Sequence, residues 1–264
     1  VGIYLNDTIV FDRLSITPGI RYDYNSITDS FMSPSLGITY KLGKETILRG
    51  SVARGFTAPP LSWTSGGALF LDPNPSLEEE RVWSYQAGFE SAALRYVWLK
   101  GTLFRHEIDE VFERTGSDEP GSMNQRFING GESRRQGFEF EAETLPFYNT
   151  SLRAGVVYVD LDPKTEAGAT EIYGFNIAVT YDDPDVLRAE IFGNYIWWDA
   201  DNFQNLEYDD FIWDLNVSKT VKMDERFSID LFLTGHNLFN GSHYTVADNK
   251  NPERWLEAGL RMKF

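Results

Sequence analysis

Segments with a two-residue hydrophobic period recur along this chain, and alternately short and long connections join them. In such a segment, apolar and polar side chains point to opposite faces of an extended strand. Residues 254–264 show the pattern clearly, since every second residue from Leu256 to Phe264 is apolar. The sequence therefore predicts an all-β protein. Its thirteen candidate strands lie near 1–10, 14–24, 32–41, 46–56, 81–90, 94–111, 134–145, 150–160, 171–181, 187–198, 208–220, 226–238 and 254–264.

The lengths of the connections narrow this class. The short connections have three to five residues (11–13, 42–45, 91–93, 146–149, 182–186, 221–225), and the long ones have seven to twenty-four (25–31, 57–80, 112–133, 161–170, 199–207, 239–253). A barrel in an outer membrane has tight turns on one side and long loops on the other, and about 9–11 tilted residues cross the bilayer. The pattern favours an antiparallel up-and-down transmembrane β-barrel, with Phe264 on the short-turn side.

The aromatic residues support two belts at two membrane interfaces. On the expected register, one group falls at the long-loop end of the strands and another at the short-turn end. The first group is Tyr24, Trp83, Tyr158, Tyr173, Tyr195, Trp197 and Trp213, and the second is Tyr40, Phe89, Tyr181, Phe227 and Phe264. The alternative is a soluble sandwich in which these rings pack in a core.

Composition excludes several classes of function. The formal net charge of −16 argues against a nucleic-acid partner, which requires clustered Lys and Arg. Without cysteine there is no disulfide, thiolate metal site or thiol nucleophile. The sequence has no run of 18 apolar residues, so it does not predict a transmembrane helix. A mean hydropathy of −0.35 is usual for soluble proteins, but half of each barrel strand also faces water.

Residues that could carry catalysis or bind a metal are not arranged for it. His106, His236 and His243 have no partner at a metal-binding spacing, and no G-x-S-x-G motif occurs. Three glutamates at alternate positions, 139, 141 and 143, fit a hydrated lumen wall. We therefore predict no catalytic residue, no metal site, no cofactor and no enzymatic activity. Acidic long loops are expected to be solvated, with divalent ions bridging them to lipopolysaccharide.

Both ends of the chain look like strand segments. Val1 begins without Met or a signal sequence, and single-chain bacterial barrels have an even number of strands and no open edge. We expect residues 1–264 to be a carboxy-terminal portion of a longer protein.

Four segments resemble the TonB-dependent receptor family of outer-membrane transporters. They are residues 51–60 (SVARGFTAPP), 72–80 (DPNPSLEEE) leading into 85–90, 129–139 (NGGESRRQGFE), and 237–244 with 251–254 and the terminal Phe264. Turn and strand-ending chemistry explains most of these motifs, so we expect them to serve folding and assembly.

The resemblance implies a 22-stranded barrel with a plug in its lumen. This chain would then be its last thirteen strands, an incomplete and open barrel without the plug and the preceding strands. The implied function is uptake of a scarce ligand, most often a ferric siderophore, across the outer membrane of a Gram-negative bacterium, energised by TonB through the missing amino-terminal region. The implied partners also include outer-membrane lipid, lipopolysaccharide and the barrel-assembly machinery, for which Phe264 would be the signal.

Candidate ligand contacts lie near the outer mouth. Arginines there suit an anionic ferric chelate, and aromatic rings suit stacking on an aromatic or macrocyclic ligand. The candidates are Arg54, Arg81 and Arg126 together with Trp63, Phe70, Trp198 and Phe203; Arg134 and Arg135 lie at the same end. Two rival functions remain at this point: a passive porin-like channel, and a barrel enzyme such as an outer-membrane phospholipase.

Overall fold

The computed structural model describes residues 1–66, 69–116, 124–162, 171–198, 210–224, 227–242, 244–246 and 249–263. For residues 198, 244–246, 249 and 250 it describes the backbone and not the side chains. The chain divides into two compact units. The first comprises residues 1–89, 102–137 and 161–163, and the second comprises residues 90–101, 138–160 and 164–264.

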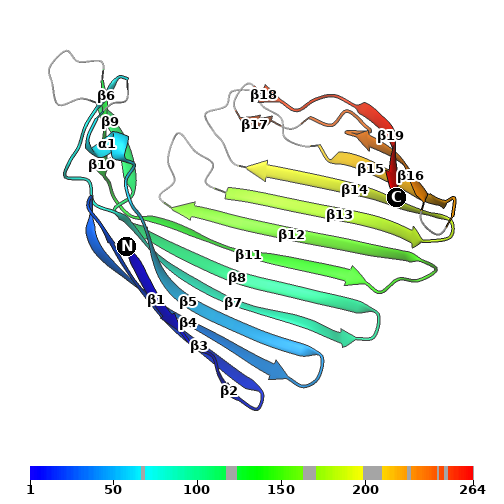
Figure 1. Cartoon of the computed structure of the whole chain (residues 1–264), viewed down its shortest axis with the longest axis horizontal. Helices are drawn as coiled ribbons and strands as arrows, with labels where there is room; N and C mark the ends of the chain where they lie inside the picture. Colours follow the sequence, from blue (N-terminus) through cyan, green and yellow to red (C-terminus); the bar gives the residue numbers. More distant parts are fainter. Residues whose placement is uncertain are drawn as a thin grey trace. The chain divides into compact units, whose positions relative to one another are not determined.

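One antiparallel sheet contains most of the strands, and neighbours in the chain are neighbours in the sheet (Figure 1). Its order is β1-β3-β4-β5-β7-β8-β11-β12-β13-β14-β15-β16-β19, with β2 also paired to β3, and it is not closed. The bounds are β1 Gly2–Asn6, β2 Ile9–Phe11, β3 Leu14–Asn25, β4 Asp29–Leu42, β5 Thr46–Thr57, β7 Glu80–Leu94, β8 Val97–Asp109, β11 Ser133–Thr144, β12 Thr150–Asp162, β13 Glu171–Asp183, β14 Leu187–Trp198, β15 Ile212–Lys222, β16 Ser228–His236 and β19 Trp255–Lys263. The predicted all-β, up-and-down topology is confirmed.

Three details of the sequence prediction are wrong. Segment 1–10 is two strands, β1 and β2. The turn before β8 lies at residues 95–96 rather than 91–93, because β7 continues through Leu94. The connection expected at 25–31 has only residues 26–28, since the Asn25 Oδ1 accepts hydrogen bonds from the Ile27 and Thr28 amides, both at 2.8 Å, and closes a tight turn.

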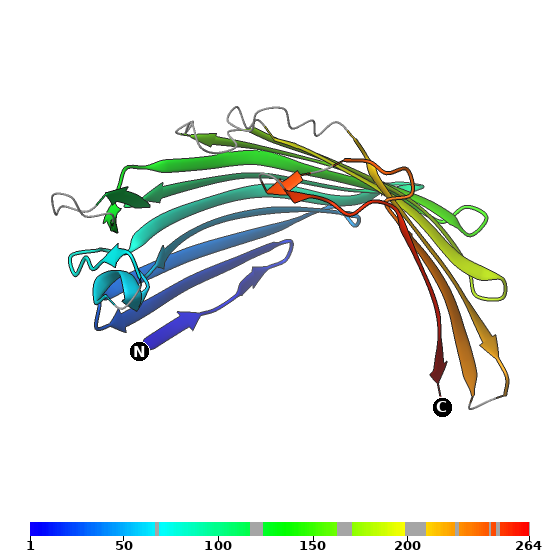
Figure 2. The same cartoon turned by 90° about the horizontal axis from the view of Figure 1, so that it is seen from above.

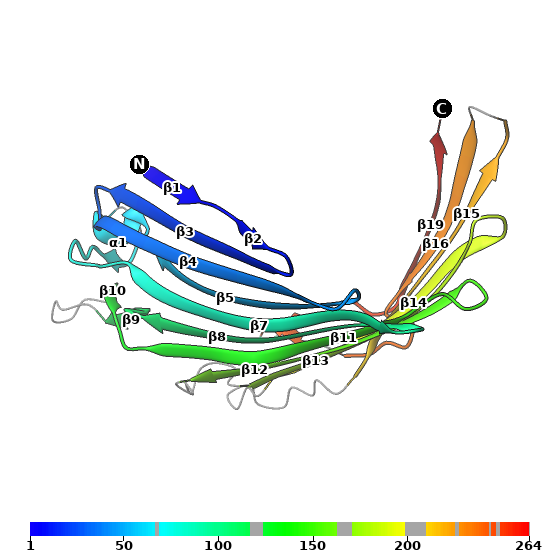
Figure 3. The ribbon, with the colours of Figure 1, turned by 90° about the horizontal axis from the view of Figure 1, so that it is seen from below.

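Two long connections of the first unit contain secondary structure that periodicity did not predict. Helix α1 (Leu61–Thr64) and strand β6 (Leu71–Asp72) lie in the first connection, and strands β9 (Phe112–Gly116) and β10 (Gln125–Asn129) lie in the second. They gather at the end of the sheet where β5 and β8 lead into these connections (Figures 2 and 3). In the second unit, β17 (Tyr244–Val246) pairs with β18 (Asn249–Lys250). Among the described residues, no helix is long and apolar enough to span a membrane.

In each unit, apolar residues of neighbouring strands lie opposite one another on one face of the sheet. In the first unit Ile20 is opposite Pro34, and Ile16 is opposite Ile38. Side chains on this face are open to the surroundings, as the 44% exposed Ile20 shows. In each unit, exposed apolar side chains line one face of the sheet. A face of this kind is the lipid-facing side of a transmembrane β-barrel wall.

The second unit repeats this arrangement and adds an aromatic row. Tyr158 lies opposite Tyr173, which lies opposite Trp197, with ring centroids 4.8 and 5.3 Å apart. The three rings come from the strand ends beside long connections, where the sequence predicted a belt.

The interior of the described chain is small. Its buried apolar side chains are Phe31, Leu77 and Ala178. A soluble sandwich of this size would bury a core of large side chains between two sheets, so this alternative is excluded for the described residues.

Candidate functional site

The two long connections of the first unit fold together into a small three-stranded sheet. Strand β10 pairs in parallel with β6 and antiparallel with β9. We call α1, β6, β9 and β10 the loop module. Of the predicted ligand contacts, Trp63 and Arg126 lie in this module, and Phe70 directly precedes its strand β6.

Trp63 anchors helix α1 to the loop module. Its ring stacks on Phe127 of β10, with centroids 3.7 Å apart and planes 8° from parallel. The edge of Phe112 in β9 meets the same ring at 5.4 Å. One face of Trp63 is therefore covered by protein, and its role as a ligand contact stays a prediction.

Asn74 joins the two connections and is 5% exposed. Its Nδ2 donates to the Phe127 carbonyl at 2.9 Å, and its Oδ1 accepts from the Ser76 hydroxyl at 2.6 Å and from Arg126 Nη2 at 3.0 Å. Arg126, a predicted chelate contact, is thus held by an internal hydrogen bond.

A second set of bonds ties the base of the module. The Asn129 Oδ1 accepts from the Glu78 amide at 2.8 Å, while its Nδ2 donates to the carbonyls of Glu78 and Glu110, both at 3.1 Å. The Glu80 Oε1 accepts from the Phe112 amide at 2.7 Å. Asn74, Glu80 and Asn129 belong to the motifs noted in the sequence, and all three hold loops in place.

Phe70 is the predicted contact that the structure leaves most open. Its side chain is 69% exposed, and the neighbouring Leu69 is 87% exposed. The Phe70 backbone has a φ of 59°, which is unusual for a bulky residue, and its carbonyl accepts from the Gln125 amide at 3.0 Å. This apolar pair is displayed by a backbone that the rest of the module fixes.

The remaining arginines of the predicted site are engaged within the protein. Arg81 pairs with Glu78 at 3.0 Å and with Glu79 at 3.3 Å. The Arg54 guanidinium lies over the rings of Phe31, at 4.6 Å, and Trp83, at 5.9 Å. The structure does not bring Arg54 into the loop module.

Three predicted residues cannot be placed. Phe203 and Phe264 lie outside the described residues, and Trp198 ends β14 with its side chain outside them. Within the part of the chain that is described, no group of three or more His, Cys, Asp or Glu side chains is arranged to hold a metal ion.

Comparison with known proteins identifies the family. A family model described as TonB dependent receptor-like, beta-barrel, matches residues 1–238. The chain belongs to this family. Its members are outer-membrane proteins of Gram-negative bacteria, so the predicted family, fold and location are confirmed.

Curated relatives match over parts of the chain. The ferrienterobactin receptor of Escherichia coli is 27% identical over 154 residues, which are 51% of this chain and 20% of the receptor. A probable TonB-dependent siderophore receptor, PirA of Acinetobacter baumannii, is 37% identical over 67 residues, or 25% of this chain and 9% of the receptor. Both relatives are receptors rather than enzymes, in agreement with the prediction of a non-enzyme.

Solved structures agree in fold. The ferric enterobactin receptor PfeA of Pseudomonas aeruginosa, in complex with BCV-L6, superposes with a TM-score of 0.79 at 17% identity. The siderophore receptor PirA of the same species gives 0.76 at 18% identity. Each comparison covers 99% of this chain but only 45% and 46% of the receptors, so the chain spans less than half of their length.

Sequence reasoning missed the partners that build the module. Phe127 and Phe112 carry the packing of Trp63, and neither stands in a recognisable motif. Trp63 lies in the first long connection, whereas Phe112 and Phe127 lie in the second. Sequence periodicity does not reveal contacts between two separate connections.

Proposed function

We propose that this chain supplies barrel wall and outer recognition loops to an outer-membrane receptor that imports a ferric siderophore with energy from TonB. The family match and the receptors named above support the receptor class. In this proposal the plug and the TonB-contacting segment belong to the rest of the protein, and Phe264 is read by the assembly machinery.

The observation that carries the ligand assignment is the exposed pair Leu69 and Phe70 on the loop module. Exposed aromatic side chains held on a fixed backbone are effective binding groups, since little conformational entropy is lost on contact. Arg126 lies in β10 of the loop module and Arg81 at the start of β7, and both supply positive charge for an anionic chelate. An apolar contact beside cationic groups suits an aromatic, negatively charged iron chelate.

Growth and binding measurements on the full-length receptor test this proposal. Under iron limitation, a deletion strain should lose growth on at least one ferric siderophore and recover it with the wild-type gene. The variant Phe70→Ala should weaken binding of that siderophore roughly tenfold, as expected for loss of one aromatic contact.

A matched control is Phe147→Ala. Phe147 is 74% exposed but lies in the short connection between β11 and β12, so its loss should leave binding unchanged. Normal growth of the deletion strain on every ferric chelate would reject the siderophore assignment.

A further inference from the structure

A histidine and a tryptophan form a stacked pair in the second unit, where the sheet leads into the last long connection. His236 ends β16, Trp255 begins β19, and the two residues lie opposite each other in the ladder. Their ring centroids are 3.8 Å apart, and the ring planes are 13° from parallel. Trp255 is nevertheless 46% exposed. The imidazole therefore covers one face of the indole ring and leaves much of the ring open.

The register of β19 places this pair on the polar face of the sheet. Leu256, which directly follows Trp255, is 68% exposed and shares its alternate positions with Leu260, on the apolar face. Because successive strand residues point to opposite faces, Trp255 points to the other face, as Glu257 does. A tryptophan of a membrane-interface belt would point to lipid. The belt that explains the aromatic row of the second unit therefore does not explain Trp255.

Hydrogen bonds hold the backbone on both sides of the stacked pair. Asn237 follows the histidine, and it donates from its amide to the Asp214 Oδ1 at 2.8 Å and from Nδ2 to the Pro252 carbonyl at 3.0 Å. Arg254 precedes the tryptophan, and its amide donates to the Asn240 Oδ1 at 2.7 Å. Since the chain is fixed at both residues, a ligand that contacts the rings orders little that is not already ordered.

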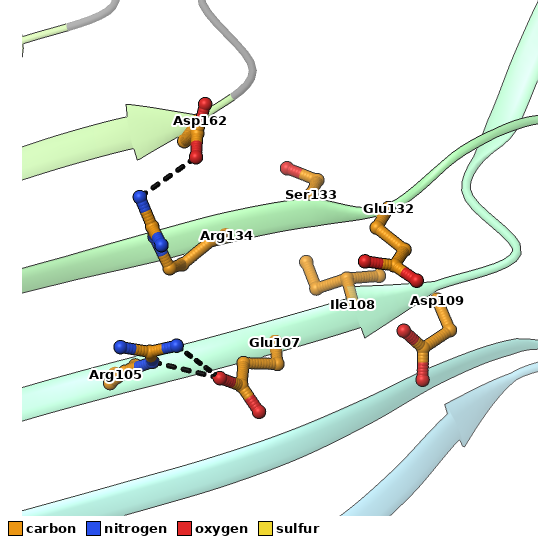
Figure 4. Close-up of a pocket in the computed structure, with 8 residues that line it drawn as sticks. All are labelled: Arg105, Glu107, Ile108, Asp109, Glu132, Ser133, Arg134 and Asp162. Carbon is orange, nitrogen blue, oxygen red and sulfur yellow. Dashed lines mark hydrogen bonds and ion pairs between the residues drawn. The ribbon is translucent and has the colours of Figure 1, made fainter.

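The charged pocket of the first unit offers no comparable site. It has a volume of about 410 Å3 and lies where β8, β11 and β12 meet their long connections (Figure 4). Arg105 pairs there with Glu107, and Arg134 pairs with Asp162 at 2.7 Å. Its cationic groups are thus matched within the protein, whereas the open part of the indole ring lacks a covering side chain.

We propose that Trp255, backed by His236, is a stacking platform for a planar aromatic group of the imported ligand. With the long connections on the outer side, as the proposed function requires, the pair lies at the outer end of the lumen face, which a ligand passes after it leaves the recognition loops. Aromatic groups stack favourably on an indole face that is already held in place. This assignment rests on the proposed function and adds a contact from the second unit that the sequence did not predict.

Affinity measurements on the full-length receptor test the platform. The probe is a ferric triscatecholate, whose iron-binding groups are aromatic rings. The variant W255L keeps an apolar side chain but loses the stacking face, so it should bind the probe roughly fivefold more weakly than the wild type. The variant W255F keeps an aromatic ring and should stay within about twofold of the wild type. Recovery in W255F separates loss of stacking from a failure to fold.

The control for these variants is F175L. Phe175 is 42% exposed but lies on the apolar face of β13, opposite Val156, so its replacement should leave the affinity unchanged. Equal affinity of W255L and the wild type for the triscatecholate would overturn the inference. An equal loss of affinity in W255F and W255L, or a matching loss in F175L, would also overturn it.

A second measurement requires neither transport nor a bound chelate. In full-length receptor labelled with fluorotryptophan, W255F identifies the fluorine resonance of Trp255. Dihydroxybenzoate should shift this resonance through its ring current, whereas cyclohexanecarboxylate, an anion of similar size without an aromatic ring, should not. No shift, or equal shifts with the two anions, would contradict the platform. A receptor that shows the aromatic shift yet binds no ferric siderophore supports the platform while rejecting the proposed cargo.

Discussion

At the scale of single residues, the side chains that matter most in the loop module are amides. Asn74 connects its own turn to the Phe127 carbonyl, 53 residues away in sequence, and to the Arg126 guanidinium. An amide suits this position because it donates and accepts at once. The motif that contains Asn74 marks a folding feature, as its turn chemistry had indicated.

Replacing Asn74 should loosen the module. In Asn74→Ala the Phe127 carbonyl and the Arg126 guanidinium each lose a hydrogen bond in a buried place, which costs about 1–3 kcal/mol. Amides of residues 125–129 should then exchange with deuterium roughly tenfold faster in the full-length receptor.

The variant Ser76→Ala serves as the comparison for Asn74→Ala. It removes only the hydroxyl that donates to the Asn74 Oδ1 and keeps the bond to the Phe127 carbonyl. Exchange of residues 125–129 should stay close to that of the wild type. An unchanged rate in Asn74→Ala itself would show that these bonds do not hold the module.

Residue types were easier to predict from the sequence than their directions. Arg134 and Arg135 are neighbours, and both were expected at the outer mouth. Since successive strand residues point to opposite faces, only one of the two can face the lumen. Arg134, which pairs with Asp162 at 2.7 Å, occupies the same alternate positions of β11 as the exposed Phe138, on the apolar face of the sheet. Extending the alternation of Phe138 and Phe140 back along β11 would have revealed this.

At the scale of elements, the strands were predictable and the loop module was not. A period of two is a local signal, and it located the strands of the large sheet, except that it merged β1 and β2 into one segment. By contrast, β6 pairs in parallel with β10, which follows more than fifty residues later, and two-residue strands carry no periodicity. The turn after β7 was misplaced because its actual residues, Arg95 and Tyr96, provide no Gly, Pro, Asn or Asp signal.

The stack of Trp63 on Phe127 should control the stability of the loop module. Trp63→Ala removes a half-buried ring from contact with both β9 and β10, at a cost of roughly 2–4 kcal/mol. Limited proteolysis of the full-length receptor should then cut within residues 57–80 and 112–133 at a markedly higher rate.

The matched variant for this prediction is Phe70→Ala in the same module. Because Phe70 is mostly exposed, its removal should leave the rate of cleavage unchanged even if ligand binding falls. Equal protease sensitivity of Trp63→Ala and the wild type would mean that the module is held together without this stack.

At the scale of the whole molecule, each unit has one face suited to lipid and one suited to water. In the second unit Val217 lies opposite Leu233, while Asn216 lies opposite Thr234. The consecutive residues Leu233 and Thr234 therefore lie on opposite faces of the sheet, one apolar and one polar. The general fold follows from this alternation, and comparison with solved receptors confirms it.

Arginine substitutions at these two positions should have opposite outcomes. Leu233 is 43% exposed on the apolar face. The substitution Leu233→Arg would place a charge in hydrocarbon, which costs about 2–4 kcal/mol of stability near the bilayer midplane. Thr234→Arg would lie opposite Glu257 on the polar face and should be tolerated.

Equilibrium unfolding of the full-length receptor in lipid vesicles measures this difference. Loss of stability in Leu233→Arg with little change in Thr234→Arg is the expected result. If Thr234→Arg were the more damaging substitution, the assignment of the two faces would be reversed.

The scarcity of buried apolar side chains bears on how such a chain reaches its destination. Hydrophobic collapse in water is favourable because it removes apolar side chains from solvent, yet the described residues bury only Phe31, Leu77 and Ala178 in this way. We therefore expect these residues to have no stable fold in water between synthesis and insertion. We expect the passage of this sequence to the membrane to require carriers that shield its apolar side chains from aggregation.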